Sequence, residues 1–171
     1  MGIYTDYFIA TDEEAMRLDL DLGVINPHVT RPTCRQEGPS FVVSATPGGE
    51  PVAVEGRPVD THSVGLLANI LRSGACEDEP KLLRAGDLPS LDVDDELLDE
   101  CEGPWLYRYS DAFRDRLALV SSEAVAGLLQ EWARADTRVS ADAYEWLLPK
   151  LIALCSRARA RGEALFAWQS L

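Results

Sequence analysis

The strongest constraint on the fold is the C-terminal stretch, which combines a long helical repeat, a stop signal and a closing apolar run. The repeat predicts a helix from about residue 140 to residue 161, kinked by Pro149 near Glu145 because proline lacks a backbone donor. Gly162 is a typical helix terminator, and the run "EALFAWQSL" after it predicts a last strand. The side chains that share the helical spacing are Tyr144, Leu147, Leu148, Leu151, Ile152 and Cys155.

Three arginines fall in the last turns of this predicted helix, at Arg157, Arg159 and Arg161. Positive charge there meets the negative end of the helix dipole. We therefore interpret them as part of a helix end and not as a basic patch for nucleic acid.

The N-terminal stretch "IYTDYFIA" predicts a strand over residues 3–10, with apolar side chains on both faces. Such a strand belongs in the interior of a sheet. Thr11 and Glu14 then form a capping-box pattern, which predicts a helix over residues 11–22 that Gly23 ends.

The middle of the chain adds further elements. We expect a loop over residues 24–40, a hairpin over 41–55, a helix over 61–73, a strand over 104–110, and helices after Ser110 and after Ser121 or Ser122. The stretches "EPKLLRAG" and "DVDDELLDECEG" predict short helices. The fold class is α+β: a single domain over residues 1–171, with a small, mostly antiparallel sheet that contains the N- and C-terminal strands and is packed by about five helices.

Charge is the unusual feature of the composition. The formal net charge is −13, and residues 77–102 hold 11 acids against 2 bases. We expect this segment to be peripheral, and so negative a surface repels nucleic acid and anionic membranes. A basic protein partner fits it, and the acids most suited to docking are Asp94, Asp95, Glu96, Asp99 and Glu100.

Motifs for chemistry are missing from the sequence. It has no phosphate-binding glycine loop, no nucleophile elbow and no zinc-protease motif, and it contains 2 histidines. The acidic run fails the calcium-loop pattern, since its sixth position is Leu97 where glycine is needed. The four cysteines, at positions 34, 76, 101 and 155, lack zinc spacing. We therefore expect no metal, no cofactor and no catalytic residue, and the sequence leans away from an enzyme without deciding the question.

The sequence also bears on the cellular compartment in which the protein is expected. The first residues do not fit a secretory signal, and no apolar run approaches the length of a membrane span. The widely spaced cysteines do not form a disulfide framework. We expect a cytoplasmic protein that does not use a membrane.

One small-ligand site is suggested around His62. Asp60 precedes it by two residues at a predicted helix start, where a carboxylate can orient an imidazole or simply cap the helix. Trp105, Tyr107 and Tyr109 share one face of the predicted strand, where they can line a pocket or form a core layer. Both interpretations of both features stay open at this point.

The second half of the chain resembles the YfbM-like proteins, small bacterial proteins of unknown function. The resemblance rests on "VDTHSVGLLANILRSG", "GPWLYRYSDAFRDRLALV" and "LIALCSRARARGEALFAWQSL", and on an N-terminal Met-Gly before a short strand. It implies a bacterial origin and an α+β fold, and it implies no activity. The acidic segment 77–102 has no counterpart in it.

Three functions are compatible with this sequence. The first is a non-catalytic binding protein that docks a basic protein partner on its acidic surface, with an immunity or antitoxin-like role as one version. The second is a small-ligand sensor or enzyme with a pocket near His62 and the Trp105/Tyr107/Tyr109 strand. The third is a homo-oligomeric structural protein, and the sequence leaves the oligomeric state open.

Overall fold

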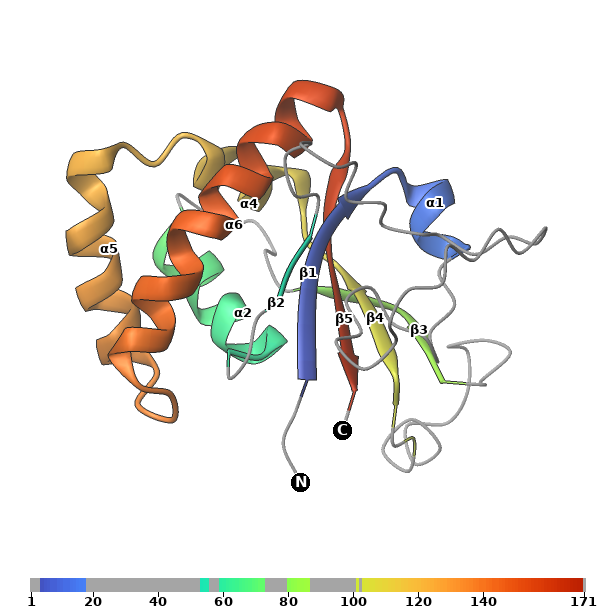
Figure 1. The fold of residues 1–171 in the computed structure, drawn as a ribbon, viewed down its shortest axis with the longest axis horizontal. Helices are drawn as coiled ribbons and strands as arrows, with labels where there is room; N and C mark the ends of the chain where they lie inside the picture. The colour runs from blue at the N-terminus through green and yellow to red at the C-terminus, as the bar shows by residue number, and fades with distance from the viewer. Residues whose placement is uncertain are drawn as a thin grey trace, which may run out of the picture.

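The protein is an α+β fold built on one five-stranded antiparallel sheet. The computed structural model describes residues 4–17, 53–55, 59–72, 80–86, 101 and 103–170. The strand order is β2-β1-β5-β4-β3 (Figure 1). The strands are β1 (Tyr4–Ala10), β2 (Ala53–Glu55), β3 (Lys81–Ala85), β4 (Trp105–Arg108) and β5 (Ala164–Ser170). The predicted fold class is confirmed.

Both terminal strands lie inside the sheet, as the sequence predicted. β1 and β5 pair along their full length, from Tyr4 opposite Ser170 to Ala10 opposite Ala164. β2 covers the outer side of β1, and β4 covers the outer side of β5. Each terminal strand is therefore bonded to a neighbour on both sides.

Four helices cover one face of this sheet, and a short one lies on the other (Figure 1). The described helices are α1 (Asp12–Met16), α2 (Thr61–Ile70), α4 (Asp111–Ala118), α5 (Ser122–Ala135) and α6 (Ala141–Arg161). Thr11 and Glu14 form the expected capping box of α1. The described part of that helix ends at Met16, and the rest of the predicted helix, residues 18–22, lies outside the described residues.

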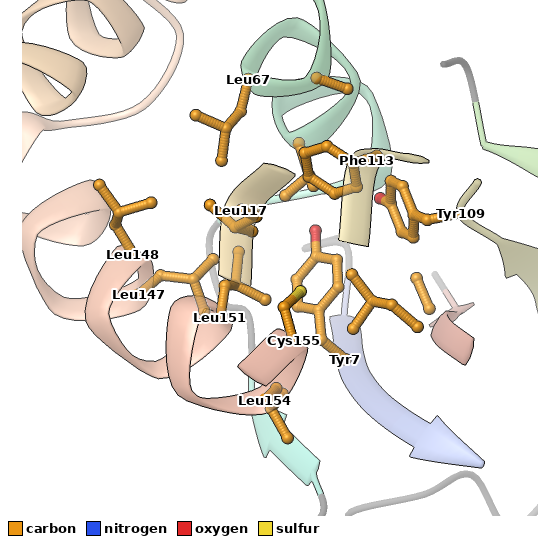
Figure 2. Close-up of a cluster of buried hydrophobic side chains, with 14 of the residues drawn as sticks. Tyr7, Leu67, Tyr109, Phe113, Leu117, Leu147, Leu148, Leu151, Leu154 and Cys155 are labelled. Carbon is orange, nitrogen blue, oxygen red and sulfur yellow. The ribbon is translucent and has the colours of Figure 1, made fainter. Parts of the chain in front are cut away.

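The main core lies between the sheet and α2, α4, α5 and α6. Figure 2 shows Tyr7 of β1 and Tyr109, which directly follows β4, beside Phe113 and Leu117 of α4 and a row of leucines from α6. All of these side chains are fully buried. Cys155 is among them, and burial raises the pKa of its thiol far above the ordinary value, so this cysteine serves packing.

The second face of the sheet carries a smaller apolar cluster. It contains Phe8, Leu106 and Phe166, with Ala15 of α1 packed on it. The rings of Phe8 and Phe166 stack with their centroids 5.4 Å apart. Apolar packing on both faces of β1 and β5 explains why these strands carry apolar residues on both faces in the sequence.

The C-terminal helix follows the predicted pattern. α6 spans 21 residues with Pro149 inside it, and Gly162 ends it in the left-handed conformation at φ 70°. Two of the three predicted arginines form ion pairs: Arg159 lies 4.0 Å from Asp115, and Arg161 lies 4.0 Å from Glu163. These pairs join the helix end to α4 and to the start of β5.

One secondary-structure prediction was wrong. The stretch "EPKLLRAG" was expected to be a short helix in a peripheral segment, but residues Lys81–Ala85 form β3 at the edge of the sheet. Pairing with β4 overrides the local helical preference of Leu82 and Arg84, and the register shifts between these two residues. The predicted loop over 24–40, the first strand of the 41–55 hairpin and the predicted short helix at 92–102 lie outside the described residues, apart from Cys101.

Candidate functional site

His62 lies exposed in the first turn of α2, beside an open depression. The depression has a volume of about 250 Å³ and is lined by Thr61, His62, Gly65, Leu66, Asn69 and Pro80. Five of these residues lie on one side of α2, and Pro80 precedes β3. His62, which the sequence analysis placed near a small-ligand pocket, therefore lies at the edge of a concave surface.

The aromatic strand is not part of this depression. Tyr109 is fully buried in the main core (Figure 2), where its ring lies 5.3 Å from that of Phe113. Tyr107 packs half-buried against the same core, and Trp105 is half-buried at the start of β4. The core interpretation thus holds for Tyr109, and the structure does not bring the three aromatics together with His62 in this pocket.

Asp60 acts as the N-terminal cap of α2. Its Oδ1 atom accepts a hydrogen bond from the backbone N–H of Ser63 at 2.8 Å. Among the residues that the structure describes, this carboxylate forms no hydrogen bond or ion pair with His62. The capping interpretation is confirmed, and Asp60 also belongs to a polar cluster in which Ser63 and Asp136 are buried.

That polar cluster consists of Asp60, Ser63, Asp136 and Arg138, and the sequence analysis missed three of its members. The Ser63 hydroxyl lies 2.6 Å from Asp136 Oδ2 and 2.9 Å from Asp60 Oδ1. It has a single proton to donate, and the shorter distance assigns that proton to Asp136. Arg138 donates from Nε to Asp136 Oδ1 at 3.0 Å and from Nη2 to Oδ2 at 3.0 Å, a bidentate pair.

Asp136 is the electrostatic centre of the polar cluster. Its side chain is 1% exposed, and burial by itself raises the pKa of a carboxyl group. Hydrogen bonds from Arg138 and Ser63, including the Arg138 backbone N–H, outweigh burial and hold the pKa of Asp136 well below its usual value. The carboxylate is therefore charged, paired and closed off from water, which suits it to fixing structure.

Buried side chains also hold the first turn of α2 against the rest of the fold. The Tyr7 hydroxyl donates to the Asp60 carbonyl oxygen at 2.8 Å and lies 3.1 Å from that of Val59, and the Trp132 indole donates to the Ser63 carbonyl at 2.7 Å. Burial raises the pKa of Tyr7 well above 10, so it remains a donor. The helix that carries His62 thus has a fixed position on the sheet.

A second feature concerns residues 87–102, which form the C-terminal part of the acidic segment 77–102. Ala85 of β3 pairs with Trp105 of β4, and the Gly86 N–H donates to the Pro104 carbonyl at 2.7 Å. Residues 87–102 are therefore an excursion from a β-hairpin whose two ends are bonded together. These 16 residues contain 8 acids and no base.

Two glycines make this closure possible. Gly86 has φ 47° and Gly103 has φ 87°, both in the region that disfavours other residues. A Cβ atom at Gly103 would lie 2.7 Å from the Trp105 ring, and one at Gly86 would lie 3.1 Å from the Gly103 carbonyl oxygen. The close approach of the two hairpin ends therefore requires glycine at both positions.

Charge is divided unevenly between the described residues and the rest. The described residues contain 14 acids and 13 bases, a balance of −1, out of −13 for the whole chain. The predicted docking residues Asp94, Asp95, Glu96, Asp99 and Glu100 lie outside the described residues. The acidity is thus a property of particular segments and not of the described body.

The described residues lack a metal-ligand cluster and a membrane-spanning helix. They contain no group of three or more histidine, cysteine or acidic side chains placed to hold a metal ion. Within the same ranges, no helix has the length and apolar character needed to cross a membrane. No protein-family model, curated protein or solved structure matches this chain. The resemblance to the YfbM-like proteins stays a prediction.

Thr5 is expected to tolerate loss of its hydroxyl. This residue of β1 is 2% exposed, and its Oγ1 atom has no hydrogen-bond partner among the described residues. A buried hydroxyl without a partner costs about 1–3 kcal/mol, so Thr5→Val should leave the free energy of unfolding unchanged or raise it by about 1 kcal/mol. Urea unfolding measures this, and a loss of stability would show that the hydroxyl has a partner.

Proposed function

We propose that this protein is a non-catalytic binding protein that docks a basic protein partner through its acidic segment, with residues 87–102 as the main contact. An immunity or antitoxin-like role is one version of this function. The observation that carries the proposal is the closed hairpin base at Gly86 and Gly103, between which the sequence holds 8 acids and no base. A charged segment on a fixed base loses less freedom on binding than one on a free linker.

The charge balance of the described body supports the same proposal. The described residues have a net charge of −1, so the acidic segment is the main source of the electric field that attracts a basic partner over long range. Such a field accelerates association with a positive partner and depends on salt. We place the protein in the cytoplasm, where the free thiols of Cys101 and Cys155 would stay reduced.

The sensor or enzyme alternative has less support. It needs His62 and the aromatic strand in one pocket, whereas the depression beside His62 is lined by none of the three aromatics. Ser63 and Asp136 of the polar cluster are a serine and a carboxylate, yet both side chains are buried and engaged with each other. Neither group is presented to a substrate from solution.

Association kinetics test the docking proposal. The partner is first recovered by tagged pull-down from the native cell lysate. A variant with Asp94, Asp95, Glu96, Asp99 and Glu100 changed to Asn or Gln should then associate about tenfold or more slowly at low salt, with a flatter salt dependence.

A matched control removes the same charge from the body. It changes five exposed acids of the described helices, Glu13, Glu123, Glu131, Asp142 and Glu145, to Gln or Asn. This control should associate within about threefold of wild type, because its charges lie away from the contact. Equal slowing of both variants would show that only net charge matters, and no slowing of the segment variant would refute the proposal.

A further inference from the structure

The solvent side of α6 carries a row of exposed, uncharged side chains, which we call the α6 seam. Figure 1 shows this helix on the outside of the molecule, in front of α4. The seam consists of Trp146, Pro149, Ala153, Ser156 and Ala160. Steps of three and four residues place these side chains in one line along the helix, the spacing with which two helices pack against each other. α6 thus has one row that packs on the core and a second row with the pattern of a helix contact.

Two large apolar side chains are exposed on this side of the molecule. Trp146 is 44% exposed, and Leu119 is 65% exposed. Leu119 directly follows Ala118, whose carbonyl oxygen lies 3.4 Å from the Ser156 hydroxyl of the seam. The Lys150 Nζ atom lies 3.1 Å from the centroid of the Trp146 ring and holds this ring in one orientation. An exposed aromatic side chain in a fixed orientation is typical of an anchor in a protein interface.

Charges of opposite sign lie at the two ends of the seam. Asp142 and Glu145 are exposed near the start of α6, and Arg159 and Arg161 are exposed in its last turn. Glu145 and Arg159 are 14 residues apart in the sequence, which is about four helical turns, so both lie on nearly the same side of the seam. The face is therefore complementary in charge to a reversed copy of itself.

We propose that the α6 seam binds a second copy of the chain, with the two α6 helices antiparallel about a two-fold axis near Ala153. In this dimer Glu145 of each copy faces Arg159 of the other copy, because a two-fold axis makes every contact occur twice. Trp146 of each copy packs over the small side chain of Ala160 in the other. This inference goes beyond acidic docking and does not depend on it.

The charge pattern favours a second copy over another occupant. A basic partner would meet the arginines at one end of the seam, and an acidic partner would meet the acids at the other end, whereas a reversed copy matches both ends. The net charge of −13 on each chain opposes association. Salt at about 0.15 M screens this repulsion beyond a distance of about 8 Å, so the dimer is expected at physiological salt.

Analytical ultracentrifugation of the full chain at about 0.15 M salt tests the pairing. A single helix pair buries less than the roughly 1,200 Å² of a stable interface, so we expect a weak dimer with a Kd on the order of 10–100 μM. The average mass should rise from that of a monomer toward that of a dimer between about 2 and 400 μM protein. A monomer over this whole range, or a series of larger oligomers, would overturn the proposal. The docking experiments use lower concentrations, at which the chain is monomeric.

Two variants that each add one negative charge separate the seam from net charge. Ala153→Glu places two carboxylates against each other at the two-fold axis and should weaken the dimer about tenfold or more. Gln130→Glu adds the same charge on the exposed side of α5, and it should change the Kd by less than about threefold. Equal weakening by both variants would show an effect of net charge and would overturn the seam.

Exchange of the end charges tests the antiparallel direction. Glu145→Arg and Arg159→Glu should each weaken the dimer about fivefold or more, because each puts like charges opposite one another. The double variant has the net charge of wild type and should recover its Kd within about threefold. A double variant as weak as the single ones would overturn the antiparallel pairing.

Thermal melting of each variant checks that the fold is intact. Arg159 also lies 4.0 Å from Asp115, so Arg159→Glu acts on a contact within the chain as well. Should this variant melt more than about 8 °C below wild type, Trp146→Ala carries the test, since it removes an exposed side chain and should weaken the dimer about tenfold. A dimer that Trp146→Ala and Ala153→Glu leave unchanged would form through another face and would overturn the proposal.

Discussion

A chain that ends at Gly162 is expected to lose its fold. Removal of residues 163–171 takes out β5, which lies between β1 and β4 and bonds to both. Leu165, Phe166 and Ala167 are fully buried, and the first two alone contribute about 5–10 kcal/mol of packing. That is comparable to the whole stability of a domain, about 5–15 kcal/mol.

Circular dichroism and size-exclusion chromatography measure this loss. The truncated chain should show no cooperative thermal transition and should elute as aggregate or as an expanded species. The control deletes residues 170–171, which leaves most of the β1–β5 pairs, and it should melt within about 8 °C of wild type. A folded, monomeric truncation at Gly162 would contradict the fold described above.

The second large effect concerns the polar cluster. Asp136→Asn keeps the volume of the side chain but removes the charge that Arg138 and Ser63 face. Hydrogen bonds to a buried charged group are worth about 1.5–3 kcal/mol each. Since the Arg138 side chain is 52% exposed and can turn toward water, we expect a net loss of about 2–3 kcal/mol in the free energy of unfolding.

Urea denaturation at several pH values measures both the size and the cause of this loss. The pKa of Asp136 is lower in the folded state, so its contribution is complete above the ordinary aspartate pKa of about 4 and is lost as pH falls further. The gap between wild type and Asp136→Asn should therefore shrink below pH 4. Asp142→Asn, an exposed acid of α6, serves as the control and should cost less than about 0.5 kcal/mol. A similarly small cost for Asp136→Asn would refute the role of the cluster.

The elements that could be predicted are those whose signals are local. The capping box of α1, the repeat of α6 and the stop at Gly162 each depend on residues within a few turns of one another, and all three are found in the structure. The two terminal strands were predictable because their apolar residues occupy both faces.

The wrong prediction, by contrast, concerned an edge strand. Lys81–Ala85 carries no period-2 pattern, and only pairing with β4 makes it a strand. That pairing joins residues on either side of a 16-residue acidic excursion, a distance over which local propensity carries no information.

The polar cluster was missed for a related reason. Ser63, Asp136 and Arg138 come from the start of α2 and from the stretch between α5 and α6, and nothing in the sequence links them. The one available signal was the pattern Asp136-Thr137-Arg138 directly after an amphipathic helix that ends near Ala135. Capping by Asp60 was one of the two interpretations that the sequence allowed, because that role needs only the N–H three residues later.

The most direct test of the docking account is a tagged pull-down from the native cell lysate, at low and at high salt, with three versions of the chain. These are wild type, the variant neutralised at Asp94, Asp95, Glu96, Asp99 and Glu100, and the body variant with five exposed acids neutralised. Wild type and the body variant should each recover a stoichiometric basic protein at low salt, and this protein should be lost at high salt. The variant neutralised at Asp94, Asp95, Glu96, Asp99 and Glu100 should not recover it. A partner retained equally by all three versions, or no basic partner with wild type, would contradict the docking account.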